Sequence, residues 1–170
     1  MKIEVKNLSK KFSNFLAVDN IDFKIEKNKT LGLLGPNGCG KTTTIGMMLG
    51  LIEPTNGNIF FDGTDINKSE KNILLNKMNF ASPYVELPKK LTVKQNLEVY
   101  GRLYGVKFLK DRIIEIADDL NLNSLLNKKT GELSSGQKNR VSLAKSLINR
   151  PLVLFLDEPT ASLDPDVGDF

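Results

Sequence analysis

The chain has only one cysteine, no long apolar run and no strong excess of charge. Because Cys39 stands alone, an intramolecular disulfide is excluded, as expected of a protein in a reducing compartment. The longest apolar run, Leu152 to Leu156, is far shorter than the roughly 20 residues needed to cross a bilayer, so a membrane role requires a partner chain. The net charge of +4 comes from scattered lysines, which does not favour a nucleic-acid partner. Residues 1–12 lack the apolar core of a signal peptide, so we expect a cytoplasmic location.

A glycine-rich stretch is the most informative sequence that is present. It reads Gly35, Pro36, Asn37, Gly38, Cys39, Gly40, Lys41, Thr42, Thr43, the pattern G-x-x-x-x-G-K-[ST] of a phosphate-binding loop. Its glycines let backbone N–H groups point at phosphate oxygens, and the N-terminus of a following helix adds further donors. Lys41 is placed for the β- and γ-phosphates, and the Thr42 hydroxyl for Mg²⁺. We therefore predict nucleotide binding here rather than a plain glycine turn.

The order of apolar patterns predicts an α/β fold. Alternating or short apolar runs predict strands around residues 3–5, 21–25, 30–34, 58–61, 78–81 and 152–156, the last as a buried parallel strand. Helical spacing predicts helices around residues 44–51, 67–77, 92–104, 113–120 and 141–148. Thr92 is a candidate N-cap. Strands enclose a mostly helical middle from about 85 to 150, so we expect an α/β core with a helical insertion.

Two adjacent carboxylates, Asp157 and Glu158, follow the last predicted strand. Open α/β sheets bind ligands at the carboxyl ends of their strands. Adjacent residues point to different sides, so the two carboxylates can do different jobs. Asp157 suits Mg²⁺ through a bound water or by holding one of the metal's ligands, and Glu158 suits the polarisation of an attacking water.

Four motifs occur in a characteristic order. The phosphate loop (Walker A) comes first, then Leu133, Ser134, Ser135, Gly136, Gln137 (signature), then Leu154 to Thr160 (Walker B), and last Ala161 to Asp164 (D-loop). In this order the chain resembles the nucleotide-binding subunit of an ATP-binding cassette (ABC) transporter over essentially its whole length. The resemblance implies a P-loop NTPase fold, with a RecA-like core, an N-terminal antiparallel β subdomain and an inserted helical subdomain. It implies one domain over 1–170, with the core at about 1–84 and 151–170 and the helical subdomain at about 85–150.

The same resemblance assigns residues to Mg-ATP. Phe12 matches the aromatic residue that stacks on adenine, with Phe15 as a rival and a core phenylalanine as the alternative. Lys41, Thr42 and Thr43 match the phosphate and Mg²⁺ contacts. Asp157 matches the metal carboxylate, and Glu158 the residue that activates water.

The resemblance also implies partners. Ser134 and Gly136 match the signature positions that touch ATP bound to an opposing subunit, while Ser135 replaces the usual glycine, and Asp164 matches the residue that communicates between the two sites. The segment Leu91 to Gly105 is similar to the drug- and antibiotic-export branch. We therefore expect an ATPase that pairs with a second nucleotide-binding subunit, as a homo- or heterodimer, and docks on an integral membrane permease at the inner face of the cell membrane.

The sequence departs from the family pattern at two places. Ser82 stands where the family has a glutamine that reaches Mg²⁺ and water, so Ser82 is a weaker metal candidate. The chain contains no histidine, and the family's switch histidine lies on a strand beyond the D-loop. We interpret the chain as truncated at its C-terminus and expect residues 1–170 alone to hydrolyse ATP weakly.

Two other functions remain open from the sequence. A soluble ABC ATPase of DNA repair would carry long coiled coils between Walker A and the signature, and no sustained heptads occur there, whereas a translation-associated protein would carry two cassettes. A regulatory subunit that binds nucleotide without hydrolysing it is favoured by Ser82 and disfavoured by Glu158.

Overall fold

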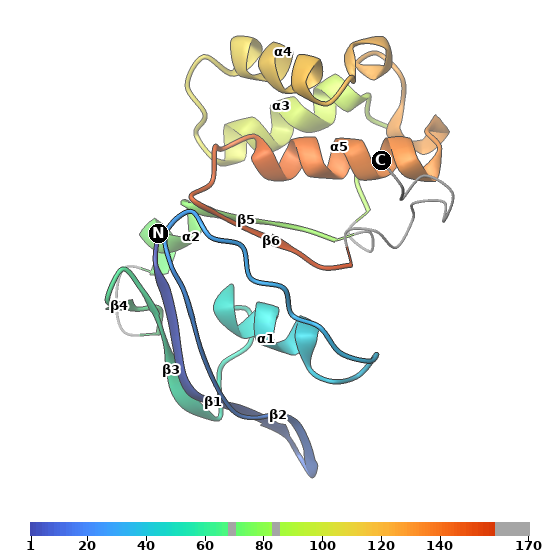
Figure 1. Ribbon diagram of the computed structural model, residues 1–170. Helices are drawn as coiled ribbons and strands as arrows, with labels where there is room; N and C mark the ends of the chain where they lie inside the picture. Colours follow the sequence, from blue (N-terminus) through green and yellow to red (C-terminus); the bar gives the residue numbers. More distant parts are fainter. Residues whose placement is uncertain (68–70, 83–85, 159–170) are drawn as a thin grey trace. The chain divides into compact units, whose positions relative to one another are not determined.

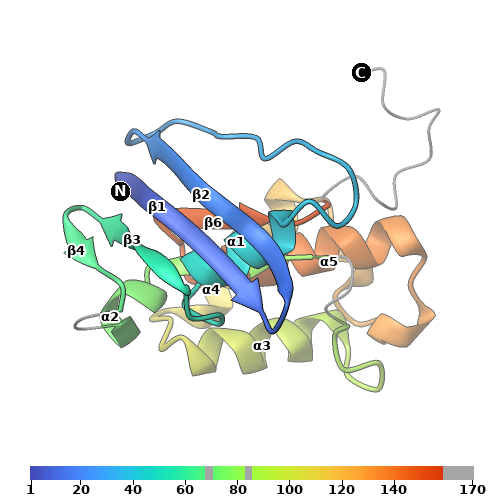
Figure 2. The ribbon, with the colours of Figure 1, turned by 90° about the horizontal axis from the view of Figure 1, so that it is seen from below.

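A four-stranded antiparallel sheet forms the body of the first part of the chain. In this computed structural model, residues 1–67, 71–82 and 86–158 are described, and the chain divides into two units, Met1–Met78 and Asn79–Phe170. The sheet of the first unit contains β1 (Ile3–Phe12), β2 (Phe15–Ile25), β3 (Asn56–Phe61) and β4 (Thr64–Asp65). Its strand order is β2-β1-β3-β4, and Figure 2 shows β1 lying between β2 and β3.

Alternation along β1 explains how this sheet buries one face. Ile3 and Val5 are buried in the core, as the period of two predicts for side chains on one face of a strand. Ile59 and Phe61 of β3 are buried as well, and they pair with Val5 and Ile3 in the strand register. Two helices complete the unit, α1 (Lys41–Met48) and α2 (Lys71–Leu75).

In its described residues, the second unit contains three helices and a short sheet. The helices are α3 (Val93–Leu103), α4 (Leu109–Asp119) and α5 (Ser135–Leu147), and two single 3₁₀ turns, η1 (Asn123–Leu125) and η2 (Thr130–Glu132), lie between α4 and α5. Their apolar stripes meet in one buried cluster that includes Leu97, Ile116 and Val141. Figure 1 shows α3, α4 and α5 lying together. The strands β5 (Met78–Ala81) and β6 (Val153–Leu156) pair with each other.

Most of the predicted elements are confirmed, and the fold class is as expected. Thr92 caps α3, and the strands at 3–5, 21–25, 58–61 and 78–81 all form. The predicted helix at 67–77 is shorter in the described residues, where it covers Lys71–Leu75. The domain boundaries at about 85 and 150 remain a prediction.

Two expectations about strands need correction. The predicted strand at residues 30–34 is wrong, because these residues join neither sheet of the described chain and Leu34 is 94% exposed. A strand forms only where a neighbour takes up its N–H and C=O groups, and apolar composition does not identify that neighbour. The last strand forms as predicted, but only Phe155 in it is buried, while Leu156 is exposed.

Candidate functional site

Three glycines shape the phosphate loop. Gly35, Gly38 and Gly40 have φ values of 154°, 85° and 91°, in the region that other residues rarely adopt. Gly40 also lies against β2, since a Cβ there would stand 2.3 Å from the carbonyl oxygen of Ala17. The glycines are therefore required for this backbone shape, which places the start of α1 behind the loop.

The N-terminus of α1 has no side-chain cap in the described residues. Its N-cap is Gly40, and within the described residues neither a side-chain cap nor an acidic residue in the first turn satisfies it. The first helical bond runs from the N–H of Thr44 to the carbonyl oxygen of Gly40, at 2.8 Å. The first N–H groups of an α-helix lie beyond the reach of its own carbonyl groups, and such a terminus attracts anions.

Lys41 lies inside the loop. Its Nζ donates to the carbonyl oxygens of Gly35 and Pro36, at 2.8 and 2.9 Å. The loop also closes on itself through the N–H of Cys39, which donates to the carbonyl oxygen of Pro36 at 3.3 Å. The ammonium is thus held at the loop by neutral carbonyls, which a phosphate group would replace with a stronger, charge-assisted partner.

The aromatic candidates lie at the β1–β2 hairpin. Phe12 and Phe15 are paired across it and are 44% and 61% exposed, so neither is a core residue. Lys10 Nζ lies 4.9 Å from the centre of the Phe12 ring. Stacking of adenine on Phe12 stays a prediction, with Phe15 as its rival.

The carboxylates Asp157 and Glu158 follow β6, at the edge where its partner strand β5 also ends. The N–H of Asp157 donates to the carbonyl oxygen of Ala81 at 3.0 Å. Because Ala81 ends β5 and Asp157 directly follows β6, the two strands run in the same direction, as Figure 1 shows. Ser82 therefore lies at the same sheet edge as Asp157 and Glu158. Asp157 and Ser82 are both buried, and Glu158 has a φ of 48°, a strained conformation of the kind that concentrates at functional sites.

A capping box forms the N-terminus of α5, at the signature. Ser134 Oγ accepts from the N–H of Gln137 at 3.3 Å, and Gln137 Oε1 accepts from the N–H of Ser134 at 3.1 Å. Leu133 is buried and anchors the turn, whereas a Cβ on Gly136 would meet nothing within 4 Å. Our prediction that Ser134 opens a helix is confirmed. The capping role of Gln137 was not predicted, although the S-x-x-Q spacing signals it.

The other end of α5 is held by a neighbouring helix. Arg112 on α4 donates from Nε to the carbonyl oxygen of Ile148 at 3.3 Å, and it also contacts the carbonyl oxygen of Leu147. Hydrogen bonds from Arg112 and Arg150 lower the pKa of Glu115, which completes this network. Burial lowers the pKa of Lys145, whose Nζ lies 5.1 Å from the centre of the Tyr100 ring. The signature helix is thus fixed at both ends.

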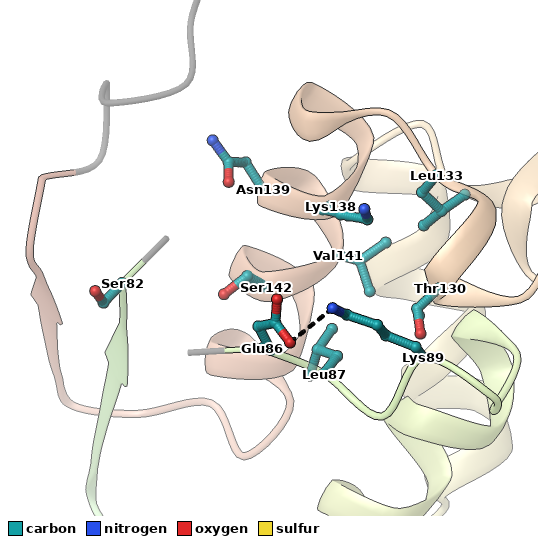
Figure 3. A pocket seen from close by; sticks show the side chains of 10 residues that line it. All are labelled: Ser82, Glu86, Leu87, Lys89, Thr130, Leu133, Lys138, Asn139, Val141 and Ser142. Atoms are coloured by element: carbon teal, nitrogen blue, oxygen red, sulfur yellow. Dashed lines mark ion pairs between the residues drawn. The ribbon is translucent and has the colours of Figure 1, made fainter. Parts of the chain in front are cut away.

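A small pocket lies beside the start of α5 (Figure 3). It holds about 100 Å³ and is lined from three directions, by Ser82, by the segment around Glu86 and Lys89, and by the first turns of α5. Glu86 and Lys89 form an ion pair at 2.9 Å. Ligand sites usually enclose at least about 300 Å³, so this pocket is too small for a nucleotide.

The structure gathers the predicted residues in separate groups. The phosphate loop belongs to the first unit, while Ser82, Asp157, Glu158 and the signature belong to the second. Asp164 lies outside the described residues. In the described chain, no three His, Cys, Asp or Glu side chains gather as a metal site. Thr42 in the first unit and Ser82 and Asp157 in the second each carry oxygen donors of the kind that Mg²⁺ prefers in proteins.

Two curated relatives match nearly the whole of this chain. The chain is 39% identical over 165 residues to the "Probable multidrug ABC transporter ATP-binding protein YbhF" of Escherichia coli K12, covering 96% of this chain and 28% of that protein. It is 38% identical over 168 residues to the "Nod factor export ATP-binding protein I" of Burkholderia lata, covering 96% of this chain and 54% of that protein. The chain thus spans about half or less of the length of these relatives.

A solved structure shares the fold. The cbiO1 protein of Clostridium perfringens, described as part of the ABC transporter complex cbiONQ, matches with a TM-score of 0.81 and 32% identity over 96% of this chain and 68% of that one. None of the helices in the described ranges is long and apolar enough to cross a membrane. Residues 18–161 match the family model described as "ABC transporter". The chain therefore belongs to the ABC transporter family and contains its ATP-binding domain.

Proposed function

We propose that this protein hydrolyses Mg-ATP to power a membrane exporter. The observation that carries the proposal is the uncapped N-terminus of α1 behind three glycines, with Lys41 held in the loop. This arrangement presents backbone N–H groups and a positive charge to a polyphosphate. The relatives whose names mention multidrug transport and Nod factor export favour an exporter.

Each group at the site has a distinct role in this proposal. The loop N–H groups and Lys41 bind the β- and γ-phosphates and stabilise the charge that develops on the transferred phosphoryl group. Thr42 and Asp157 hold Mg²⁺, with Ser82 as a further oxygen at the same sheet edge as Asp157. Bound Mg²⁺ neutralises phosphate charge. Glu158, at the end of β6, accepts a proton from the attacking water.

The signature completes the site of a second subunit. The Ser134 hydroxyl oxygen accepts from Gln137, so its own O–H is directed elsewhere and can donate to a phosphate oxygen. Gly136 leaves open space beside it, because a Cβ there would meet nothing within 4 Å. Two subunits therefore enclose ATP between the phosphate loop of one and the signature of the other, while Asp164 connects the two sites.

The helices of the second unit provide a surface for a permease. Leu103 on α3 and Phe108 before α4 are 76% and 82% exposed. Exposed large apolar side chains are typical of surfaces that bind partners when they gather in patches. The naming of cbiO1 as part of a transporter complex supports such a partner. In this proposal the protein works at the cytoplasmic face of the membrane, bound to a permease.

The test is Glu158→Gln in the full-length protein with its permease. We expect ATP binding to persist while steady-state hydrolysis falls by about 10²- to 10⁴-fold, the usual contribution of a general base. Asp119→Asn, an exposed carboxylate on α4, serves as the control and keeps wild-type turnover. Wild-type turnover in Glu158→Gln would remove Glu158 from its role. If the unsubstituted protein binds ATP without hydrolysing it, the chain is a regulatory subunit, the function that the short side chain of Ser82 favours.

A further inference from the structure

Two segments that each lead into a helix lie side by side in the second unit. The segment before α3 and the segment before α5 are joined by backbone hydrogen bonds. The N–H of Thr130 donates to the carbonyl oxygen of Leu91, and the N–H of Gly131 to that of Lys89, each at 3.0 Å. The approach to the signature is therefore fixed to the chain that precedes α3.

Two buried side chains reinforce this pairing. The Thr130 hydroxyl donates to the carbonyl oxygen of Pro88 at 2.7 Å. Asn96 Nδ2 lies 3.1 Å from the carbonyl oxygen of Thr92, 3.3 Å from that of Pro88 and 3.4 Å from Thr130 Oγ1. We call Pro88, Asn96 and Thr130 the Asn96–Thr130 cluster.

The buried amide of Asn96 lowers the stability of the Asn96–Thr130 cluster. Asn96 is completely buried, and its Oδ1 is the buried side-chain atom without a hydrogen-bond partner among the described residues. An unsatisfied buried oxygen lowers stability, and an apolar side chain of similar shape would avoid that cost. The amide is therefore poorly explained by stability alone, whereas its NH₂ group fixes the directions of two segments at once.

Thr130 of the Asn96–Thr130 cluster lies just before the signature in the sequence. Thr130 begins η2, and its carbonyl oxygen accepts from the N–H of Leu133 at 3.4 Å. Leu133 is buried, and Ser134 follows it as the N-cap of α5. Thr130 and Leu133 also line the pocket of Figure 3, so the Asn96–Thr130 cluster and the signature turn lie against the same pocket.

We propose that Asn96 and Thr130 are positioning residues for the signature, because the hydrogen bonds of their cluster hold Ser134 and Gly136 in the position that meets the ATP of a second subunit. This inference rests on the proposed function, in which the signature contacts ATP only after two subunits pair. Loss of the Thr130 hydroxyl shifts the turn while the backbone bonds of Thr130 and Gly131 keep the segments joined. It therefore weakens ATP-driven pairing and leaves the phosphate loop unchanged.

The test compares Thr130→Val with Thr130→Ser in the full-length protein carrying Glu158→Gln. Valine keeps the shape of threonine without the hydroxyl, whereas serine keeps the hydroxyl. For Thr130→Val we expect about a tenfold rise in the ATP concentration at half-maximal pairing, measured by size-exclusion chromatography. Thr130→Ser stays within about twofold of the parent, and fluorescent-nucleotide affinity of the unpaired protein is the same in all three. Pairing of Thr130→Val at the parent's ATP concentration overturns the proposal.

A second measurement separates this inference from the proposed function. If two copies of the Glu158→Gln parent do not pair in the presence of ATP, the two-subunit function fails. Hydrogen exchange then tests whether the Asn96–Thr130 cluster positions the turn. We expect Thr130→Val to speed exchange at the amides of Leu133 and Gln137 about tenfold relative to Thr130→Ser. Equal exchange in the two variants shows that the hydroxyl does not position the turn.

Discussion

The N-termini of α1 and α5 both face a proposed phosphate, yet they are built in opposite ways. In the described residues α1 begins at Gly40 without a side-chain cap, whereas Ser134 and Gln137 cap α5 with reciprocal hydrogen bonds. Neither helix has an acidic residue in its first turn. Both therefore suit an anion, but in the described residues only α1 lacks a side-chain cap.

This difference matches the order in which the two ends meet ATP in the proposed cycle. The phosphate loop binds nucleotide first, so its donors gain a partner in the single subunit. The signature meets ATP only when a second subunit arrives, so its helix must be stable before then. A capping box supplies that stability, and a Ser134 O–H remains to donate.

The largest expected effect is a difference in stability between two variants, each of which adds one methyl group at the start of a helix. Gly40→Ala places a Cβ 2.3 Å from the Ala17 carbonyl oxygen at a φ of 91°, so we expect a loss of about 3 kcal/mol in the free energy of unfolding. Gly136→Ala meets nothing within 4 Å, so its stability stays within about 1 kcal/mol of wild type. Urea denaturation of both variants measures the difference.

The two glycine variants also differ in function. Gly136→Ala is expected to fold and bind ATP but to pair poorly, because its methyl group occupies the space left for phosphate. If Gly40→Ala and Gly136→Ala lose equal stability, the contrast between a required and a permissive glycine is wrong. If Gly136→Ala pairs normally, Gly136 has no contact with ATP.

A smaller effect separates capping from ATP contact at the signature. Ser134→Ala and Thr92→Ala each remove one capping box, from α5 and α3, so each should cost about 1 kcal/mol of stability. Only Ser134→Ala should also weaken ATP-driven pairing, because Thr92→Ala keeps the Thr92 carbonyl oxygen that Asn96 contacts and removes only the cap of α3. Thermal unfolding and size-exclusion chromatography with ATP measure the two quantities. Equal pairing in both variants would show that Ser134 acts as a cap alone.

The local geometry of the phosphate loop and of the signature turn could be predicted from residue spacing. The phosphate loop and the helix that Ser134 opens depend on neighbouring residues, so a short pattern contains the information that specifies them. Thr92 was likewise identified as an N-cap from its place before an apolar stripe. The capping partner Gln137 was available from the same kind of spacing but was not recognised.

Long-range pairing explains what the sequence did not reveal. The predicted strand at residues 30–34 failed because its ladder partner cannot be read from an apolar run. The hydrogen bond between Asn96 and Thr130 joins residues 34 positions apart, and nothing in either local sequence indicates the other. The exposure of Phe12 likewise depends on the hairpin, not on its own neighbours in the chain.

The composite site is the central claim, and a linked dimer of two full-length copies tests it most directly. Both copies carry Glu158→Gln, and Lys41→Ala and Gly136→Ala are placed either on different copies or on the same copy. ATP retained per linked dimer is then measured after rapid removal of free nucleotide. If each site joins the phosphate loop of one copy to the signature of the other, the split arrangement keeps one intact site and retains ATP, while the same-copy arrangement damages both sites and retains none. Retention by the same-copy arrangement and loss in the split one would contradict the account.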